Sequence, residues 1–231
     1  TAYLIVAVTV FNTKPADQTC KGMELIINDS IDHGFITQKE VLRLLNSKKL
    51  SPIGKKMGDI NTRLLEDELS KHPLIENVEC YRTPGRKIGI EVTQRLPLLR
   101  VMAANGDNYY IDSKGKVMPI PNSSAHVAVV TGSVDRDFAT KELYKLGIFL
   151  QNHPLWEAQI EQINVTPAKE LELVPRVGEH IIFLGKPGDY EEKFERLKIF
   201  YKKGLNQVGW NKYSRISLEF SNQIICTKKE K

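Results

Sequence analysis

The sequence predicts an α+β fold made of two successive modules. Stretches of alternating apolar residues, which are typical of strands, are interspersed with amphipathic helical stretches. The strand-like run 87–93 leads to Pro97, which has no N–H for a central sheet ladder, so the first sheet is expected to end there. Two turn signals follow closely, and they predict that a second sheet opens as a meander.

The length and composition of the chain are those of a globular protein. The 231 residues are 41% hydrophobic and 26% charged, and a chain of this length can bury roughly 70% of its unfolded surface. The formal charge of +5 is scattered among acidic residues, which favours a solvated surface over the alternative of a polyanion site. Cys20, Cys80 and Cys226 are an odd set without metal-site spacing, so neither a disulfide framework nor a zinc site is indicated.

The N-terminal residues 3–11 form an uncharged apolar run that leads into the polar stretch 12–17. As a helix this run spans about 14 Å, against a hydrocarbon core of roughly 30 Å, so it cannot cross a membrane alone. We expect residues 1–19 to be the end of a transmembrane helix and its linker. A buried N-terminal strand is the alternative, whereas a signal peptide is disfavoured because no small-x-small cleavage site follows.

The first module, residues 20–96, is predicted to run strand, helix, helix, strand, strand. Thr37 and Glu40 form a capping box at the start of the first helix. Asn61 is placed to cap the second helix, which stops before Pro73. Strands are expected at 20–28, 75–81 and 87–93, and the expected core contains Val41, Leu45, Leu65, Leu69, Val78 and Val92.

The second module, residues 97–227, begins with two turns. Asn105-Gly106 predicts a type I′ hairpin, since both residues tolerate positive φ, and Asp112 with Gly115 predicts a type I turn. Asp137 is expected to cap a helix that ends near His153-Pro154. Further strands are expected at 127–130, 160–165, 170–174, 180–184, 213–220 and 223–227, with a helix after Asp189 and a basic tail at 228–231.

The order and spacing of these signals carry a family resemblance. A strand followed by Gln94-Arg95-x-Pro97 and then by Tyr110-Ile111-Asp112-x-x-Gly115 resembles the FtsQ/DivIB family of bacterial cell-division proteins. The resemblance implies that residues 20–96 are a POTRA domain and residues 97–227 an FtsQ-type β domain, a mixed sheet with flanking helices. Its inter-domain motif would be Arg95, Pro97, Tyr110, Asp112 and Gly115.

The same resemblance implies a function. Members of the family are non-catalytic scaffolds of the division machinery, anchored in the inner membrane by a single span, with most of the chain on the periplasmic side. They bind FtsB and FtsL, and the POTRA domain is a candidate site for other division proteins. The end of the β domain is the expected partner site, as an edge that takes up a partner strand; it comprises Phe220, Ser221, Asn222, Gln223, Ile224 and Ile225.

Two alternatives stay open at this point. These last residues could form an ordinary covered edge strand, with Phe220 or Ile224 in the core. Where the family commonly has Asp-Leu-Arg before an aromatic residue, this chain has Ser217-Leu218-Glu219 before Phe220, so the family's ion pairs do not transfer. The alternative function is the periplasmic POTRA part of an outer-membrane biogenesis or two-partner secretion protein, although the helices expected near 137–153 and 189–203 do not fit a barrel.

No pattern indicates catalysis, a cofactor or nucleic-acid binding. The histidines are dispersed and lack metal-ligand spacing, and neither a nucleophile elbow nor a glycine-rich phosphate loop is present. Tyr109 and Tyr110 alternate along a strand, so at most one of them can be exposed for stacking on a base. The sequence therefore predicts a binding protein and no metal site.

Overall fold

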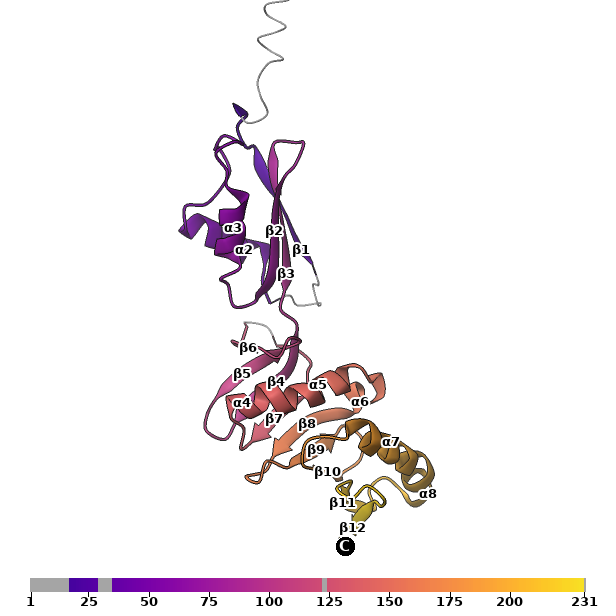
Figure 1. Cartoon of the computed structure of the whole chain (residues 1–231). Coiled ribbons are helices and arrows are strands. Elements are labelled where there is room, and N and C mark those ends of the chain that lie inside the picture. The colour runs from indigo at the N-terminus through magenta and orange to yellow at the C-terminus, as the bar shows by residue number, and fades with distance from the viewer. Residues whose placement is uncertain (1–16, 29–34, 122–123, 231) are drawn as a thin grey trace, which may run out of the picture. The chain divides into compact units, whose positions relative to one another are not determined.

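The computed structural model describes residues 17–28, 35–121 and 124–230 (Figure 1). The chain divides into two compact units, with the main boundary between Arg95 and Leu96. The apolar run 3–11 lies outside the described residues. Within the described ranges, no helix has both the length and the apolar character needed to span a bilayer.

The first unit has the predicted strand, helix, helix, strand, strand order. Its elements are β1 (Gly22–Asn28), α2 (Gln38–Ser47), α3 (Thr62–Leu69), β2 (Ile75–Arg82) and β3 (Lys87–Gln94). The sheet order is β1-β3-β2. The central strand β3 is parallel to β1 and antiparallel to β2.

Both predicted caps of this unit are confirmed. The hydroxyl of Thr37 accepts a hydrogen bond from the N–H of Glu40 at 3.2 Å, and the carboxylate of Glu40 accepts one from the N–H of Thr37 at 2.8 Å. The side chain of Asn61 accepts a hydrogen bond from the N–H of Leu64 at 3.1 Å. These bonds satisfy N–H groups that the first helical turn leaves without partners.

The core of the first unit lies between the two helices and the sheet. All six predicted core residues are buried, with Val41, Leu69 and Val92 fully so. Cys20 and Cys80 are free thiols in this core. The 3.6-residue period of the helices and the alternation of the strands thus select the same buried set.

The second unit is a nine-stranded mixed sheet with helices, and it confirms the α+β class. The strand order is β12-β11-β10-β9-β8-β7-β4-β5-β6. The strands are β4 (Pro97–Ala103), β5 (Asn108–Asp112), β6 (Val117–Met118), β7 (Val129–Gly132), β8 (Ile160–Val165), β9 (Leu171–Pro175), β10 (Ile181–Gly185), β11 (Tyr213–Ser217) and β12 (Ile225–Lys228).

The helices of this unit share one hydrophobic core with one face of the sheet (Figure 1). The first helical stretch runs through α4 (Arg136–Phe138), a π-helical segment (Ala139–Leu143) and α5 (Tyr144–Gln151), and α6 (Pro154–Gln159) follows. The second runs through α7 (Tyr190–Phe200), a π-helical segment (Tyr201–Leu205) and α8 (Asn206–Val208). Residues such as Leu146 and Leu197 face strand residues such as Ile163 in this core.

Three local predictions need correction. The turn at Asn105-Gly106 is not type I′, because Gly106 alone of the pair has positive φ; the carbonyl of Ala103 accepts from the N–H of Gly106 at 3.0 Å, as in a type I turn with a bulge. Asp135 rather than Asp137 caps α4. The pair His153-Pro154 does not simply end a helix, since Pro154 is the first residue of α6, a position where its missing N–H costs nothing.

Candidate partner-binding edge

The strand β12 forms one edge of the large sheet. It pairs with β11 in antiparallel register, with Ile225 opposite Ser217 and Cys226 opposite Ile216. Among the described residues no other strand pairs with it. An edge strand carries a row of N–H and C=O groups that can pair with another chain.

The outward-facing groups of β12 can be assigned from its neighbours. The N–H of Lys229 donates to the carbonyl of Lys212 at 3.1 Å, and the carbonyl of Thr227 accepts from the hydroxyl of Ser214 on β11 at 3.4 Å. Main-chain groups of successive strand residues point to alternate sides. Thr227 therefore faces β11, and Cys226 and Lys228 direct their N–H and C=O groups away from the sheet.

A loop joins β11 to β12, where the sequence predicted two nearly continuous strands. β11 ends at Ser217 and β12 begins at Ile225, so of the predicted partner site only Ile225 lies in a strand. The reason is a contact with α7 that is distant in sequence. The guanidinium of Arg196 donates to the carbonyls of Leu218 at 3.1 Å, of Phe220, and of Gln223 at 3.2 Å, and these bonds hold the loop in a folded-back shape.

A groove lies between this loop and the α7 helix with its π-helical extension. Its volume is about 430 Å³. Ile199 in its lining is 47% exposed. Phe220 in the loop and Ile225 at the start of β12 are 46% and 45% exposed. The groove is lined by Arg196, Ile199, Phe200, Lys203, Gly204, Asn222, Gln223 and Ile224.

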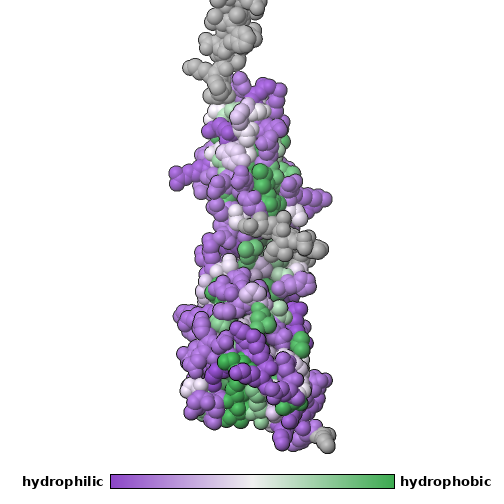
Figure 2. Space-filling view, turned by 90° about the vertical axis from the view of Figure 1, so that its right-hand side faces the viewer, coloured by the Kyte–Doolittle hydropathy of each residue, from purple (hydrophilic) through white to green (hydrophobic). Residues whose placement is uncertain are grey.

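The six predicted site residues therefore lie together, around the loop and the first position of β12. Phe220, Ser221, Asn222, Gln223 and Ile225 are exposed, and Ile224 is half-buried against the core. Other apolar groups are exposed elsewhere on a largely hydrophilic surface (Figure 2). What sets this site apart is that exposed apolar side chains adjoin an open strand edge. Sequence reasoning missed Arg196, because nothing in its local pattern distinguishes it from other helix-surface cations.

The motif that carried the family resemblance has structural roles. Arg95 ends the first unit, where its N–H donates to the carbonyl of Leu74 at 3.0 Å. Pro97 begins β4 opposite Asp112. Tyr110 is fully buried. The buried carboxylate of Asp112 accepts hydrogen bonds from the N–H groups of Lys114 and Lys116 at 2.9 and 2.8 Å. Gly115 has a φ of +75°, and the side chain of Tyr144 lies close to it.

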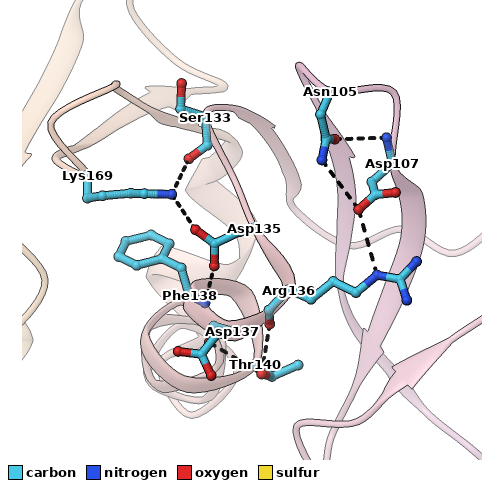
Figure 3. Close-up of polar contacts among 9 residues, drawn as sticks. All are labelled: Asn105, Asp107, Ser133, Asp135, Arg136, Asp137, Phe138, Thr140 and Lys169. Carbon is cyan, nitrogen blue, oxygen red and sulfur yellow. Dashed lines mark hydrogen bonds and ion pairs between the residues drawn. The ribbon is translucent and has the colours of Figure 1, made fainter.

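A cluster of charged side chains at the start of α4 is a helix cap rather than a reactive centre (Figure 3). The carboxylate of Asp135 accepts from the N–H of Phe138 at 2.8 Å and pairs with the ammonium of Lys169 at 2.6 Å. That ammonium also donates to the carbonyl of Ser133 at 2.9 Å. These bonds hold the pKa of Asp135 below its usual value, and the hydrogen bond from Lys169 is the largest cause.

His180 and Tyr201 form a buried pair of titratable side chains. The imidazole of His180 contacts the hydroxyl of Tyr201 at 2.9 Å, and the ring of Trp210 lies against both. Burial lowers the pKa of His180 and raises that of Tyr201. Burial thus favours the neutral form of both side chains. The described residues contain no group of three His, Cys, Asp or Glu side chains that could bind a metal ion.

Comparison with known proteins gives two family matches and several relatives. Residues 96–227 match the family described as FtsQ/DivIB, C-terminal related, and residues 18–93 match the POTRA-like domain. The chain is 25% identical over 187 residues to the cell division protein FtsQ of Geotalea daltonii, which covers 76% of this chain and 66% of that protein. It is 25% identical over 196 residues to FtsQ of Rhodothermus marinus, with 74% and 67% covered.

A third relative, FtsQ of Myxococcus fulvus, is 27% identical over 171 residues, with 68% of this chain and 57% of that protein covered. The chain thus spans about two thirds or less of the length of these curated relatives. The family match alone covers more than half of the chain, and it coincides with the second unit that carries the β12 edge. The chain belongs to the FtsQ/DivIB family.

Proposed function

We propose that this protein is a non-catalytic, membrane-anchored scaffold of the bacterial division machinery and that the β12 edge holds a partner of the FtsB or FtsL type. The observation that carries the proposal is the open edge of β12 beside the loop that Arg196 holds. The cell-division role rests on the relatives named FtsQ. The kind of partner rests on the family resemblance, and its proposed place on the surface rests on the geometry of the edge.

The edge supplies two kinds of interaction. A partner segment in strand conformation pairs with the outward N–H and C=O groups of Cys226 and Lys228, which adds a tenth strand next to β12. An apolar side chain of the partner fills the groove beside Ile199 and Ile224. Phe220 stands exposed in the loop as an aromatic anchor, the class of residue that dominates binding energy at many interfaces.

The membrane anchor is a separate part of the proposal. The apolar run 3–11 precedes the first described residue, Asp17, by a short polar stretch, and FtsQ-family proteins are membrane-anchored. We expect the protein to remain with inner membranes after washing with high salt or carbonate and to leave them with detergent. Release by salt or carbonate alone would contradict the anchor without bearing on the β12 edge.

Binding of the FtsB-type partner from the same organism, measured by calorimetry, tests the partner site. Lys228→Pro removes an outward N–H and leaves the bonds to β11 in place, so we expect binding to be lost while the melting temperature is unchanged. Phe220→Ala should weaken binding by about 2 kcal/mol, or roughly 30-fold. Leu155→Ala on α6, which removes a side chain that is 53% exposed, is the matched apolar control and should leave the affinity unchanged.

A proline at Ile225 is a less direct test. By the same alternation, the N–H of Ile225 faces Ser217 on β11, so Ile225→Pro would weaken the existing sheet and could abolish binding for that reason alone. Unchanged affinity in both Lys228→Pro and Phe220→Ala would place the partner site elsewhere on the protein.

A further inference from the structure

One end of the first unit gathers basic residues from three segments of the chain. The N–H of Cys20 donates to the carbonyl of Lys55, and the N–H of Lys21 donates to the carbonyl of Arg86, both at 2.8 Å. Thr19 forms a β-bridge with Lys56. We call the set Lys21, Lys55, Lys56, Arg82 and Arg86 the basic end of the unit.

Most residues of the basic end are exposed. Lys21, Lys55, Lys56 and Arg82 are exposed and Arg86 is half-buried. In the described part of the chain none of them forms an ion pair, in contrast with Lys87, which pairs with Glu24 at 2.8 Å. The acidic residues nearby in the chain, Asp17 and Asp59, are fewer, so this end carries a net positive charge.

A shallow pocket lies within the basic end. It has a volume of about 690 Å³. The guanidinium of Arg82 at its wall is held by hydrogen bonds to the carbonyls of Met57 at 3.1 Å and Ile60 at 2.8 Å. The lining residues are Gln18, Met57, Gly58, Arg82, Thr83, Pro84 and Arg86. The pocket is wide enough for a small polar group and has cations on its wall.

This end is also where the chain enters the unit from the apolar run 3–11. Residues 12–16 separate that run from Asp17, and the six residue steps from Phe11 to Asp17 reach about 20 Å when the chain is fully extended. With the run in a bilayer, the basic end therefore cannot be farther from the lipid surface than this tether allows. A positive surface held so near a membrane is attracted by anionic headgroups, because each Lys or Arg near such a surface gains about 1 kcal/mol, or about five-fold in affinity.

We propose that the basic end docks on the anionic phospholipid headgroups of the membrane in which the protein is anchored. This contact fixes the first unit against the lipid surface. The proposal uses the membrane anchor of the proposed function but not its partner site.

Sedimentation with lipid vesicles tests it. The chain from Asp17 onward, which keeps both hydrophobic cores, is compared with its triple variant Lys21→Gln, Lys55→Gln, Lys56→Gln. The matched control Lys39→Gln, Arg43→Gln, Lys116→Gln removes the same charge from exposed positions outside the basic end. Vesicles contain either phosphatidylcholine alone or phosphatidylcholine with one third phosphatidylglycerol, and circular dichroism checks that all variants are folded.

We expect binding to the phosphatidylglycerol vesicles only, with an affinity about 100-fold lower for the triple variant and nearly unchanged for the control. Added salt should weaken the binding of the parent chain. Equal binding to both kinds of vesicle, equal loss in both variants, or no binding at all would overturn the proposal. Competition by millimolar inorganic phosphate at constant ionic strength would also overturn it, because it would indicate a single-phosphate pocket instead of a lipid surface.

Discussion

Replacement of Arg196 by alanine is the sharpest test of how the candidate site is held. The side chain is 19% exposed and its guanidinium donates to the carbonyls of Leu218, Phe220 and Gln223. Water can replace the guanidinium as donor to the carbonyls of Phe220 and Gln223, because both residues are exposed. Leu218 is fully buried, so its carbonyl is left without a partner, and such a group costs about 1 to 3 kcal/mol.

The predicted loss of unfolding free energy is therefore about 2 kcal/mol, which corresponds to roughly 5 to 10 °C in the melting temperature of a unit of this size. The larger effect should be local. Without the guanidinium, the loop 218–224 loses its fixed shape, so its amides should exchange hydrogen faster. Partner affinity should also fall, because binding must then order the loop.

Thermal unfolding and amide hydrogen exchange measure the two effects in the same samples. Arg196→Lys keeps the charge but loses the forked geometry, so it should restore only part of the protection. Lys198→Ala, two positions along α7, removes an exposed ion pair with Glu195 and should change stability by less than 1 kcal/mol. If Arg196→Ala left both the melting temperature and the exchange of residues 218–224 at their original values, the assigned role of the guanidinium would be wrong.

Three further predictions concern the two cores and the cap of α4. Leu69→Ala, at a fully buried position, should cost about 2 to 5 kcal/mol in thermal unfolding of the first unit. Gly132→Ala should prevent stable folding of the second unit, since φ is +91° and a Cβ would lie 2.2 Å from the carbonyl oxygen of Val165. A melting temperature equal to that of the parent protein would refute this. Asp135→Ala should cost about 0.5 to 2 kcal/mol at pH 7. The pKa of Asp135 is lower in the folded than in the unfolded protein. Its contribution to stability is therefore present above the pKa of the unfolded state, near 4, and is lost as the pH falls through the folded-state pKa. A stability difference between parent and Asp135→Ala that did not change with pH would refute the ion pair.

Local signals explain what could be predicted from the sequence. Capping by Thr37 and Asn61 depends on side chains that reach only a few residues along the chain, so spacing alone identifies it. The turn at Asp112 and Gly115 is likewise local: the carboxylate of Asp112 accepts the N–H groups that follow it. The buried faces of α2 and α3 follow from helical period, which places Val41 and Leu65 toward the sheet.

The errors arose where distant groups decide local structure. Asp135 and Asp137 are both suitable N-cap residues by type. Asp135 is also contacted by Lys169, more than thirty positions later in the chain, and spacing alone does not reveal this contact. The sequence predicts that the strand extends through Phe220 because apolar and polar residues alternate from Ile216 onward. The carbonyl bonds from Arg196, more than twenty positions earlier, fold that segment into a loop. No periodicity in the sequence encodes such a contact.

The edge strands of the two sheets differ in whether side chains occupy their outward main-chain groups. This difference supports β12 as the proposed partner-binding edge. At β1 the side chain of Gln38 donates to the carbonyl of Leu25 at 3.0 Å, and at β2 the carboxylate of Glu66 accepts from the N–H of Cys80 at 2.7 Å. Both bonds occupy main-chain groups that a foreign strand would need.

At the far edge of the large sheet, β6 has only two residues, too few for extended pairing. In the described part of the chain, β12 has no comparable side-chain cover on its outer side, and only the charge of Lys228 stands against unselective pairing. Edges that receive no partner are usually blocked. An edge left open beside the loop held by Arg196 and beside an apolar groove therefore supports the proposal that a partner strand pairs with β12.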